Sequence, residues 1–328
     1  MEILEAILLG LTQGLTEFLP ISSSGHLFLL ERLGIGEPSI FFNLTLHVGT
    51  LFAAVWYYRK SLFRLLRRPF GREAMSLVSA TAVTGAVAFV YKKFFPEVLN
   101  GGMLAAGFFC TAAIIFLSET FGNKKERAAV TPMEKAEAVT PMEKTEAVTP
   151  MEKAGAVTEA RAPKSTDANM RLKGTTALEE RRAKKSGRSN KAPDKNIGAA
   201  RSGANGVSLV NALICGAAQG IAVLPGLSRS GATIGTLILL GEERGRAADF
   251  SFLMSIPVIM AGACAEAAES GAFELDASGI FPIIAGFIAA AVSGYIAVGL
   301  FVKLIRKKNM KGFALYAAFL GALCLLIF

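Results

Sequence analysis

Two short, similar segments hold most of the residues in this 328-residue chain that could do chemistry. The first reads GLTQGLTEFLPISSSG at residues 10–25, and the second reads GAAQGIAVLPGLSRSG at residues 216–231. Residue types that recur 206 positions apart are Gly10, Gln13, Gly14, Ser22, Ser24 and Gly25, which return as Gly216, Gln219, Gly220, Ser228, Ser230 and Gly231. The prolines are out of step by one position, so the pair indicates a diverged duplication.

The first segment carries an acid, a hydroxyl and a base at Glu17, Ser23 and His26. Glu17 lies in an otherwise apolar stretch, and an ionisable side chain inside a membrane segment indicates a functional site. Gln13 precedes it by four residues and shares its helix face. Two oxygen-bearing side chains on one face could hold a hard divalent cation together with phosphate oxygens.

The serine run of the first segment, Ser22 to Ser24 with Gly25, opens a second short helix. Such a turn presents backbone N–H groups and hydroxyls to an anion. Helix capping is the structural alternative, and it accounts for one serine but not for three. His26 could transfer a proton near neutral pH, and its place beside the serines and Glu17 favours that role over a purely structural one. We interpret His47, inside an apolar span, as a hydrogen-bonded structural residue.

The second segment carries a cation, Arg229, in an apolar region with no acid nearby in the sequence. A guanidinium binds phosphate through two parallel hydrogen bonds, and Ser228, Ser230 and Thr233 add hydroxyl donors around it. The structural alternative is that Arg229 pairs with Glu17 and only holds the two halves together. Either interpretation brings the two segments into contact.

The elements that must position these residues are membrane helices. Hydrophobic residues make up 52% of the chain, its mean hydropathy is +0.45, and its apolar blocks are about 20 residues long, which is the length that spans a bilayer. We therefore predict an all-α polytopic membrane protein. The start, MEILEAILLG, has no basic n-region, so we expect no cleavable signal peptide. The four isolated cysteines predict neither disulfides nor a zinc site.

The pattern predicts two membrane repeats, at residues 1–121 and 206–328, each with one re-entrant helix pair and three spans. The predicted ranges are 2–33 for the first pair, followed by spans at 41–58, 74–91 and 101–120, and 207–241 for the second pair, followed by spans at 248–268, 279–302 and 312–328. Pro20 and Pro225 interrupt the pairs, because proline after an apolar run stops a helix. Three crossings are an odd number, so the second repeat should have inverted topology.

Residues 122–205 form a polar, basic linker that we predict to be disordered and cytoplasmic. Its 18 Lys and Arg residues against 11 Asp and Glu residues give +7 of the net charge of +9, so the basic balance does not indicate nucleic-acid binding by the fold. Nonapeptide repeats begin at Val130, Val139 and Val148, each with a proline. Basic loops around residues 59–72 and 303–311 fall on the same predicted side as the linker. Both termini and the mouth of the first pair then face the non-cytoplasmic side.

The two segments also resemble a known family. QGLTEFLPISSSGH is similar to the (E/Q)xxxE-plus-His region, and PGLSRSGAT to the PGxSRSxxT signature, of the undecaprenyl-diphosphate phosphatases, the bacitracin-resistance type of integral membrane phosphatase. The resemblance implies a hydrolase of the bacterial inner membrane that converts undecaprenyl diphosphate to the monophosphate and recycles the lipid carrier for peptidoglycan and other envelope polymers. It also implies a divalent cation, Mg²⁺ or Ca²⁺, and a site open to the periplasm.

The resemblance assigns roles to particular residues. It implies Glu17, Ser23, His26 and Arg229 as catalytic, and Glu17 with Gln13 as metal ligands. The diphosphate-binding residues would be Ser22, Ser24, Gly25, Ser228, Arg229, Ser230 and Thr233. Two features depart from the family pattern: the first acidic position is a glutamine, Gln13, and the linker of more than eighty residues is not expected.

Several alternatives stay open from the sequence. The nucleophile is Ser23 with His26 or Glu17 as base, which we favour, or His26 itself, or an activated water. A membrane transporter or flippase for a polyprenyl phosphate would need the same anion cradle, but it would not need an acid, a base and a nucleophile beside it. A structural anchor for the linker leaves both motifs unexplained. Expected partners are the polyprenyl diphosphate and membrane lipids, and a homodimer is left open.

Overall fold

The computed structural model describes residues 2–36, 39–99, 102–122, 206–270, 280–307 and 309–327. Within these ranges the chain forms ten α-helices, a 3₁₀ turn (Pro96–Leu99) and a π-helical turn (Ser118–Gly122), with no strand. The linker predicted at 122–205 lies, beyond Gly122, outside the described residues, and so do its nonapeptide repeats.

The first 32 residues form a helix–turn–helix hairpin of α1 (Ile3–Phe18) and α2 (Ser23–Arg32). Pro20 comes two residues after the end of α1, and the chain turns at Ser22, which has a positive φ of 69°. Ser22 also caps α2, because its hydroxyl accepts a hydrogen bond from the Gly25 N–H at 3.4 Å. At about 1.5 Å per residue both helices are shorter than the ~30 Å hydrocarbon core.

A second hairpin of the same design consists of α8 (Leu209–Ile221) and α9 (Arg229–Leu239). Its turn passes through Pro225 and through Gly226, whose φ of 82° requires a residue without a side chain. Ser228 caps α9 by accepting from the Gly231 N–H at 3.1 Å. The recurring serines 22 and 228 thus have the same local function, which is to start the second helix of each hairpin.

Five longer helices of the described chain are long and apolar enough to cross a membrane. They are α3 (Ile40–Arg67), α4 (Arg72–Phe94), α5 (Leu104–Leu117) with the π-helical turn that continues it, α10 (Arg244–Ser270) and α11 (Ile280–Lys307). The last helix, α12 (Lys311–Ile327), is apolar but has only 17 residues. The structure therefore confirms an all-α, multi-pass membrane architecture.

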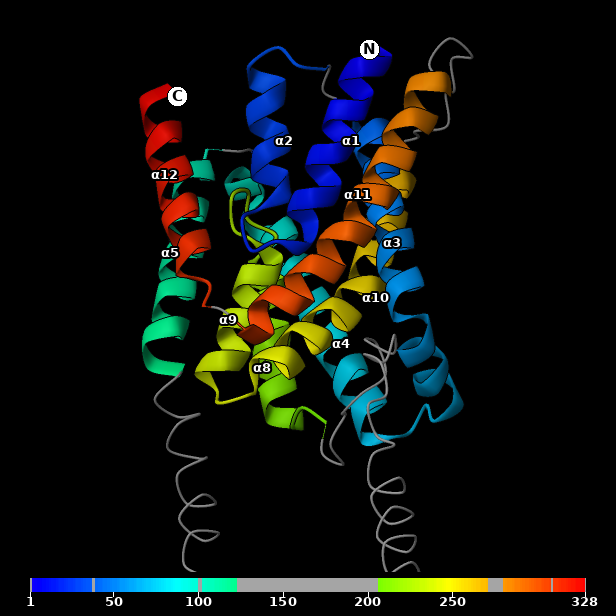
Figure 1. Cartoon of the computed structure of the whole chain (residues 1–328), viewed down its shortest axis with the longest axis vertical. Coiled ribbons are helices and arrows are strands. Elements are labelled where there is room, and N and C mark those ends of the chain that lie inside the picture. The colour runs from blue at the N-terminus through cyan, green and yellow to red at the C-terminus, as the bar shows by residue number, and fades with distance from the viewer. Residues whose placement is uncertain are drawn as a thin grey trace, which may run out of the picture. The chain divides into compact units, whose positions relative to one another are not determined.

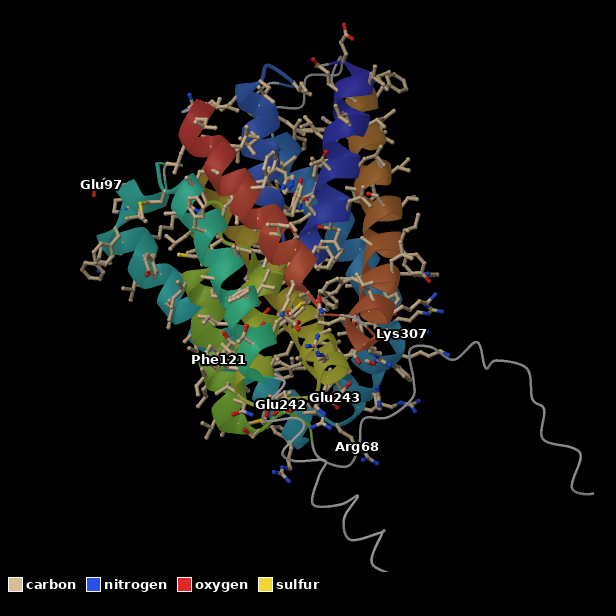
Figure 2. All side chains as sticks on the ribbon, turned by 60° about the vertical axis from the view of Figure 1, so that its left-hand side comes forward. Arg68, Glu97, Phe121, Glu242, Glu243 and Lys307 are labelled. Atoms are coloured by element: carbon tan, nitrogen blue, oxygen red, sulfur yellow. The ribbon has the colours of Figure 1, made fainter. Side chains whose placement is uncertain are left out.

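The hairpins pack against spans from the other half of the chain. Helix α1 lies along α11, and α8 lies along α4, while α5 packs on α12 and α3 on both α10 and α11. In Figure 1 the first hairpin enters from the end where the N- and C-termini lie, and the second enters from the opposite end. In Figure 2 the labelled residues Arg68, Glu242 and Glu243 gather at that opposite end.

The recurring glycines explain how closely the hairpins approach these spans. A Cβ atom at Gly10 would overlap the carbonyl oxygen of Gly286 on α11, and one at Gly14 would overlap the Ser293 hydroxyl. In the second hairpin, a Cβ atom at Gly216 would overlap the Ala80 carbonyl oxygen on α4. Small residues at these positions let the backbones touch, which is how helices associate where lipid removes the hydrophobic driving force.

A buried ion pair fixes the end of the molecule opposite the termini. The Arg244 guanidinium at the start of α10 contacts both carboxylate oxygens of Glu119, at 2.8 and 2.6 Å. Glu119 also accepts from the Met310 N–H at 2.9 Å, just before α12. One carboxylate thereby joins the end of α5 to the starts of α10 and α12.

Candidate active site

The turns of the two hairpins meet at one buried carboxylate, that of Glu17. Its Oε1 lies 3.0 Å from Arg229 Nη1, so the acid of the first hairpin forms an ion pair with the cation of the second. Its Oε2 accepts from the Ser23 hydroxyl at 2.6 Å and from Gln13 Nε2 at 3.0 Å. The side chain of Glu17 is 2% exposed, whereas that of Arg229 is 25% exposed. The cluster therefore has a buried acid and a cation that still reaches open space.

Local helix geometry accounts for this cluster. Gln13 and Glu17 are four residues apart on α1, which places them one above the other on the face that points into the molecule. Ser23 is the first residue of α2, and the turn at Pro20 brings it back toward the end of α1. Arg229 is the first residue of α9. Three of the four groups therefore sit at helix ends, where the chain reverses.

The hydroxyl groups of the second hairpin are bonded within the protein. Ser230 donates to the Leu19 carbonyl oxygen of the first hairpin at 3.0 Å, and its hydroxyl lies 3.2 Å from that of Ser228. Thr233 lies one turn further along α9, where its hydroxyl is 2.6 Å from that of Ser251 on α10. Ser228 and Ser230 therefore lie at the contact between the hairpins, whereas Thr233 lies between α9 and α10.

Span α5 contacts the turn of the second hairpin and holds it in place. The Thr111 hydroxyl accepts from the Ser228 N–H at 2.8 Å and lies 3.2 Å from the Gly226 carbonyl oxygen. A Cβ atom at Gly107, one turn earlier, would overlap the Pro225 carbonyl oxygen. The turn that presents Arg229 is thus held by backbone contacts to a full span.

Of the next two predicted residues of the first hairpin, one is exposed and one is buried. Ser24 is exposed, with its hydroxyl 3.4 Å from that of Ser22. Gly25 is buried, and a Cβ atom there would come within 2.5 Å of the Phe108 ring on α5. Gly25 therefore has a packing function, because it lets α2 approach α5 closely.

His26 does not contact Glu17 or Ser23 through any hydrogen bond of the described chain. Its Nδ1 lies 2.6 Å from the Ser22 carbonyl oxygen, and its Nε2 lies 2.9 Å from the Tyr316 hydroxyl on α12. The His26 and Tyr316 rings stack, with centroids 5.7 Å apart and planes 16° apart. His26 is thus close to the cluster in sequence but bonded to a different helix. His47, predicted to be structural, contacts the Asn43 carbonyl oxygen at 2.9 Å.

The donor set fits a divalent cation that is shared with a substrate. Gln13 is fully buried, and its Oε1 has no hydrogen-bond partner among the described residues. With the adjacent Glu17 carboxylate it would offer two oxygens on one helix face, the type of ligand that Mg²⁺ and Ca²⁺ prefer. The described residues contain no group of three or more acidic, His or Cys side chains that could hold a metal alone. A cation here would need oxygens from the substrate as well.

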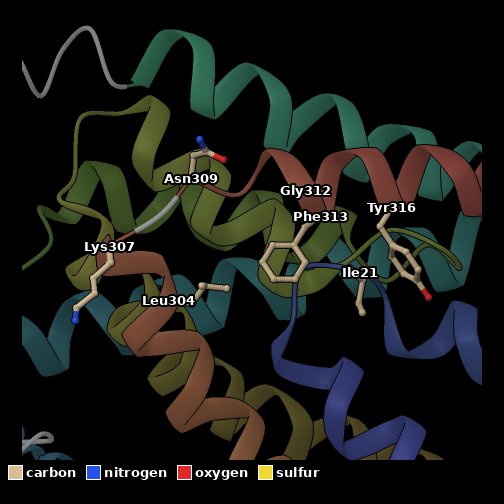
Figure 3. A pocket seen from close by; sticks show the side chains of 7 residues that line it. All are labelled: Ile21, Leu304, Lys307, Asn309, Gly312, Phe313 and Tyr316. Carbon is tan, nitrogen blue, oxygen red and sulfur yellow. The ribbon is translucent and has the colours of Figure 1, made fainter.

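A cavity of about 810 Å³ lies beside the first hairpin (Figure 3). Its lining residues are Ile21, Leu304, Lys307, Asn309, Gly312, Phe313 and Tyr316. Ile21 belongs to the turn between α1 and α2, and Tyr316 is the partner of His26, so the cavity lies next to the turn of the first hairpin and to the His26–Tyr316 pair.

Three residues near the site were missed by sequence reasoning: Thr111, Ser251 and Tyr316. Thr111 is the only hydroxyl-bearing residue of α5, and Tyr316 is the only one of α12. A lone hydroxyl in an apolar span was a usable signal. It is ambiguous, because threonine commonly bonds to its own helix and tyrosine commonly lies at a membrane interface.

Known proteins match this chain over nearly all of the described residues. The family model described as "Bacitracin resistance protein BacA" matches residues 6–142 and 177–323. A curated protein of Campylobacter curvus named undecaprenyl-diphosphatase is 31% identical, with 100% of each chain covered. Proteins of the same name from Desulfatibacillum aliphaticivorans and Carboxydothermus hydrogenoformans are 31% and 29% identical, covering 82% and 79% of this chain and 79% and 71% of theirs. The chain therefore belongs to the bacitracin resistance protein BacA family.

Proposed function

We propose that this protein is an undecaprenyl-diphosphatase, which hydrolyses undecaprenyl diphosphate to undecaprenyl phosphate and inorganic phosphate. The observation that carries the proposal is the junction at Glu17, where a hydroxyl from one hairpin and a guanidinium from the other meet a single buried carboxylate. The relatives named undecaprenyl-diphosphatase support the same activity. The product would return to peptidoglycan and other envelope synthesis as lipid carrier.

Arg229 binds the diphosphate in this proposal. A guanidinium has five N–H donors in a planar fork, and the contact with Glu17 uses one nitrogen, Nη1. The partly exposed side chain can therefore keep its carboxylate partner while its other donors bind phosphate oxygens. Ser228 and Ser230 would add donors from the second hairpin, and Thr233 would support the helix that carries Arg229. The exposed Ser24 would contact the phosphate from the first hairpin, while Ser22 and Gly25, which bond to each other, would shape the turn that presents it.

Ser23 is the proposed nucleophile, with Glu17 as its base. The 2.6 Å contact supports this pairing, because a proton can pass directly from the Ser23 hydroxyl to Glu17 Oε2. The serine oxygen would form a bond to the terminal phosphorus while the bond between that phosphorus and the bridging oxygen breaks, releasing undecaprenyl phosphate. Water would then hydrolyse the phosphoserine. His26, bonded on both ring nitrogens, would exchange protons with the departing phosphate or with that water.

A divalent cation would be held by Glu17 and Gln13 together with phosphate oxygens of the substrate. The unpartnered Gln13 Oε1 supports this assignment. When bound, Mg²⁺ or Ca²⁺ would neutralise charge on the transferred phosphoryl group, which is a large part of catalysis in such reactions.

The membrane placement that we propose is two inverted-topology repeats in the inner membrane, with the active site toward the periplasm and the linker in the cytoplasm. Two observations support the inversion. The hairpins enter from opposite ends in Figure 1, and α1 packs on α11 as α8 packs on α4, each through the equivalent pair of glycines. The basic cluster at the end of α3, which includes Arg64, Arg67 and Arg68, supports a cytoplasmic location for that end. The homodimer stays a prediction.

Phosphate release from undecaprenyl diphosphate by the purified protein in detergent tests this function. We expect release with Mg²⁺ or Ca²⁺, loss of release with EDTA, and restoration when the cation is added back. Ser23→Ala should lose release while retaining the wild-type melting temperature. If well-folded wild-type protein released no phosphate with either cation, the proposal would be wrong, and lipid transport would be the next activity to measure.

A further inference from the structure

The His26 ring is held from both sides by partners on different helices. On one side, its Nδ1 lies 2.6 Å from the Ser22 carbonyl oxygen. A carbonyl oxygen can only accept, so Nδ1 carries a proton. In the neutral ring Nε2 is then the basic nitrogen, and it accepts from the Tyr316 hydroxyl at 2.9 Å. The contacts therefore select one of the two neutral tautomers of His26.

Tyr316 keeps this contact whichever proton His26 carries. A hydroxyl can donate to the neutral Nε2, and it can accept from Nε2–H once the ring is protonated. The stacked rings, with centroids 5.7 Å apart, hold the imidazole plane while the proton changes. The Phe108 ring packs edge-on against the His26 ring, with the ring centroids 6.1 Å apart. No other hydroxyl group contacts the His26 ring in the described chain.

The position of Tyr316 in the fold is itself fixed. It lies on α12, which packs along α5, and the backbone just before α12 is held by the buried Glu119 carboxylate. Tyr316 also lines the cavity, together with Ile21 from the turn of the first hairpin (Figure 3).

We propose that Tyr316 is a positioning residue for the phosphatase reaction: it holds the plane of the His26 ring by stacking and bonds Nε2 in both protonation states, while the Ser22 carbonyl oxygen sets the tautomer. This inference rests on the proposed function. It adds α12, at the far end of the chain, to the two hairpins as a source of active-site residues. Groups that only orient a functional histidine typically contribute about 10- to 100-fold to activity.

The first test is kinetic and uses Tyr316→Phe, which removes the hydroxyl and keeps the stacked ring. We expect kcat to fall about 10-fold with KM within about twofold, because the variant changes proton exchange and not lipid binding. Tyr91→Phe is the matched control, since it removes a hydroxyl from an α4 ring that packs on Phe95. Wild-type kcat in folded Tyr316→Phe would overturn the inference. Wild-type protein without phosphatase activity would instead contradict the proposed function.

The second test is spectroscopic and does not depend on turnover. The chain has only two histidines, so ¹⁵N-histidine labelling in micelles gives two ring spin systems, and His47→Gln assigns them. We expect the His26 ring to be protonated at Nδ1 at alkaline pH in both proteins, because the Ser22 carbonyl oxygen is unchanged, and the Nε2 resonance to shift in Tyr316→Phe, because Nε2 loses its hydroxyl partner. A wild-type His26 protonated at Nε2, or an Nε2 resonance unchanged in Tyr316→Phe, would show that Tyr316 does not have this function.

Discussion

The two hairpins share a backbone design but carry opposite chemistry. Both break at a proline, both start their second helix with a capping serine, and both use a pair of glycines to touch a span of the other half. The position of Glu17 corresponds to Val223, that of Ser23 to Arg229, and that of His26 to Ala232. The residues that shape the hairpin are therefore the same in both segments, while the residues that face the junction differ: an acid and a hydroxyl on one side and a cation on the other.

The corresponding glutamines show the divergence at a single position. Gln13 donates to the Glu17 carboxylate at 3.0 Å, whereas Gln219 donates to the Thr84 hydroxyl of α4 at 3.2 Å. Both are buried, and both have an Oε1 without a partner among the described residues. The same residue thus lies beside a carboxylate in one hairpin and beside a structural hydroxyl in the other. This difference predicts that only the first hairpin binds the cation.

The serines of the first hairpin give the largest expected contrast. Ser23→Ala should lower kcat about 10³-fold or more, because it removes the proposed nucleophile. The neighbouring exposed Ser24 makes one weak contact, at 3.4 Å, so Ser24→Ala should stay within about tenfold of wild type, the loss expected of one phosphate contact. Phosphate release from both variants measures this. Equal losses would indicate that the serines act together as an anion cradle and that another group attacks.

The glutamines give the next largest contrast. Gln13→Leu should lower activity about 10- to 100-fold and raise the concentration of Mg²⁺ needed for half-maximal activity, because it removes a proposed ligand oxygen. Gln219→Leu should leave the cation requirement unchanged. A titration with Mg²⁺ measures both variants. If Gln219→Leu changed the requirement as much as Gln13→Leu, the two hairpins would not be functionally distinct at this position.

The contact between the turn of the second hairpin and α5 tests how Arg229 is held in position. Thr111→Val keeps the shape of the side chain but leaves the Ser228 N–H without its acceptor. A buried unpaired donor costs about 1–3 kcal/mol, so we expect a lower melting temperature together with weaker substrate binding. Thr120→Val, at a half-buried position of the π-helical turn, is the control, since the Thr120 hydroxyl bonds to its own helix at Phe116. A lower melting temperature with an unchanged KM would show that this contact stabilises the fold but does not affect substrate binding.

The glycines give the smallest contrast, because here the hairpins should behave alike. Gly14→Ala and Gly220→Ala each place a methyl group against an opposing helix, on α11 and α4 respectively. Overpacking of this kind costs about 1–3 kcal/mol, and thermal unfolding in detergent should show similar losses for the two variants. Gly85→Ala on α4, where a Cβ atom meets nothing within 4 Å, is the control. A loss confined to one hairpin would show that the packing is not equivalent.

The sequence predicted the hairpins and the residues at their junction, because prolines, capping serines and charges in apolar segments are local signals. The Glu17–Arg229 contact itself was one of the two interpretations offered for Arg229. The residues that hold the site from outside had only an ambiguous signal in the sequence, a single hydroxyl in an apolar span. Thr111 and Tyr316 come from spans α5 and α12, and the packing of α1 on α11 depends on small-residue faces that look like any other apolar surface in the sequence. The bonding of His26 to Tyr316, 290 positions away, has no local signature.

The central claim is that the two hairpins form one active site through Glu17 and Arg229. A double-mutant cycle on phosphate release, with Glu17→Gln, Arg229→Gln and both together, tests it most directly. We predict that each single variant loses about 10³-fold or more and that the double variant loses little beyond either one, because residues that act as a unit are strongly non-additive. A folded Arg229→Gln variant with near wild-type release and a lowered melting temperature would contradict the claim and reduce the contact to a structural link.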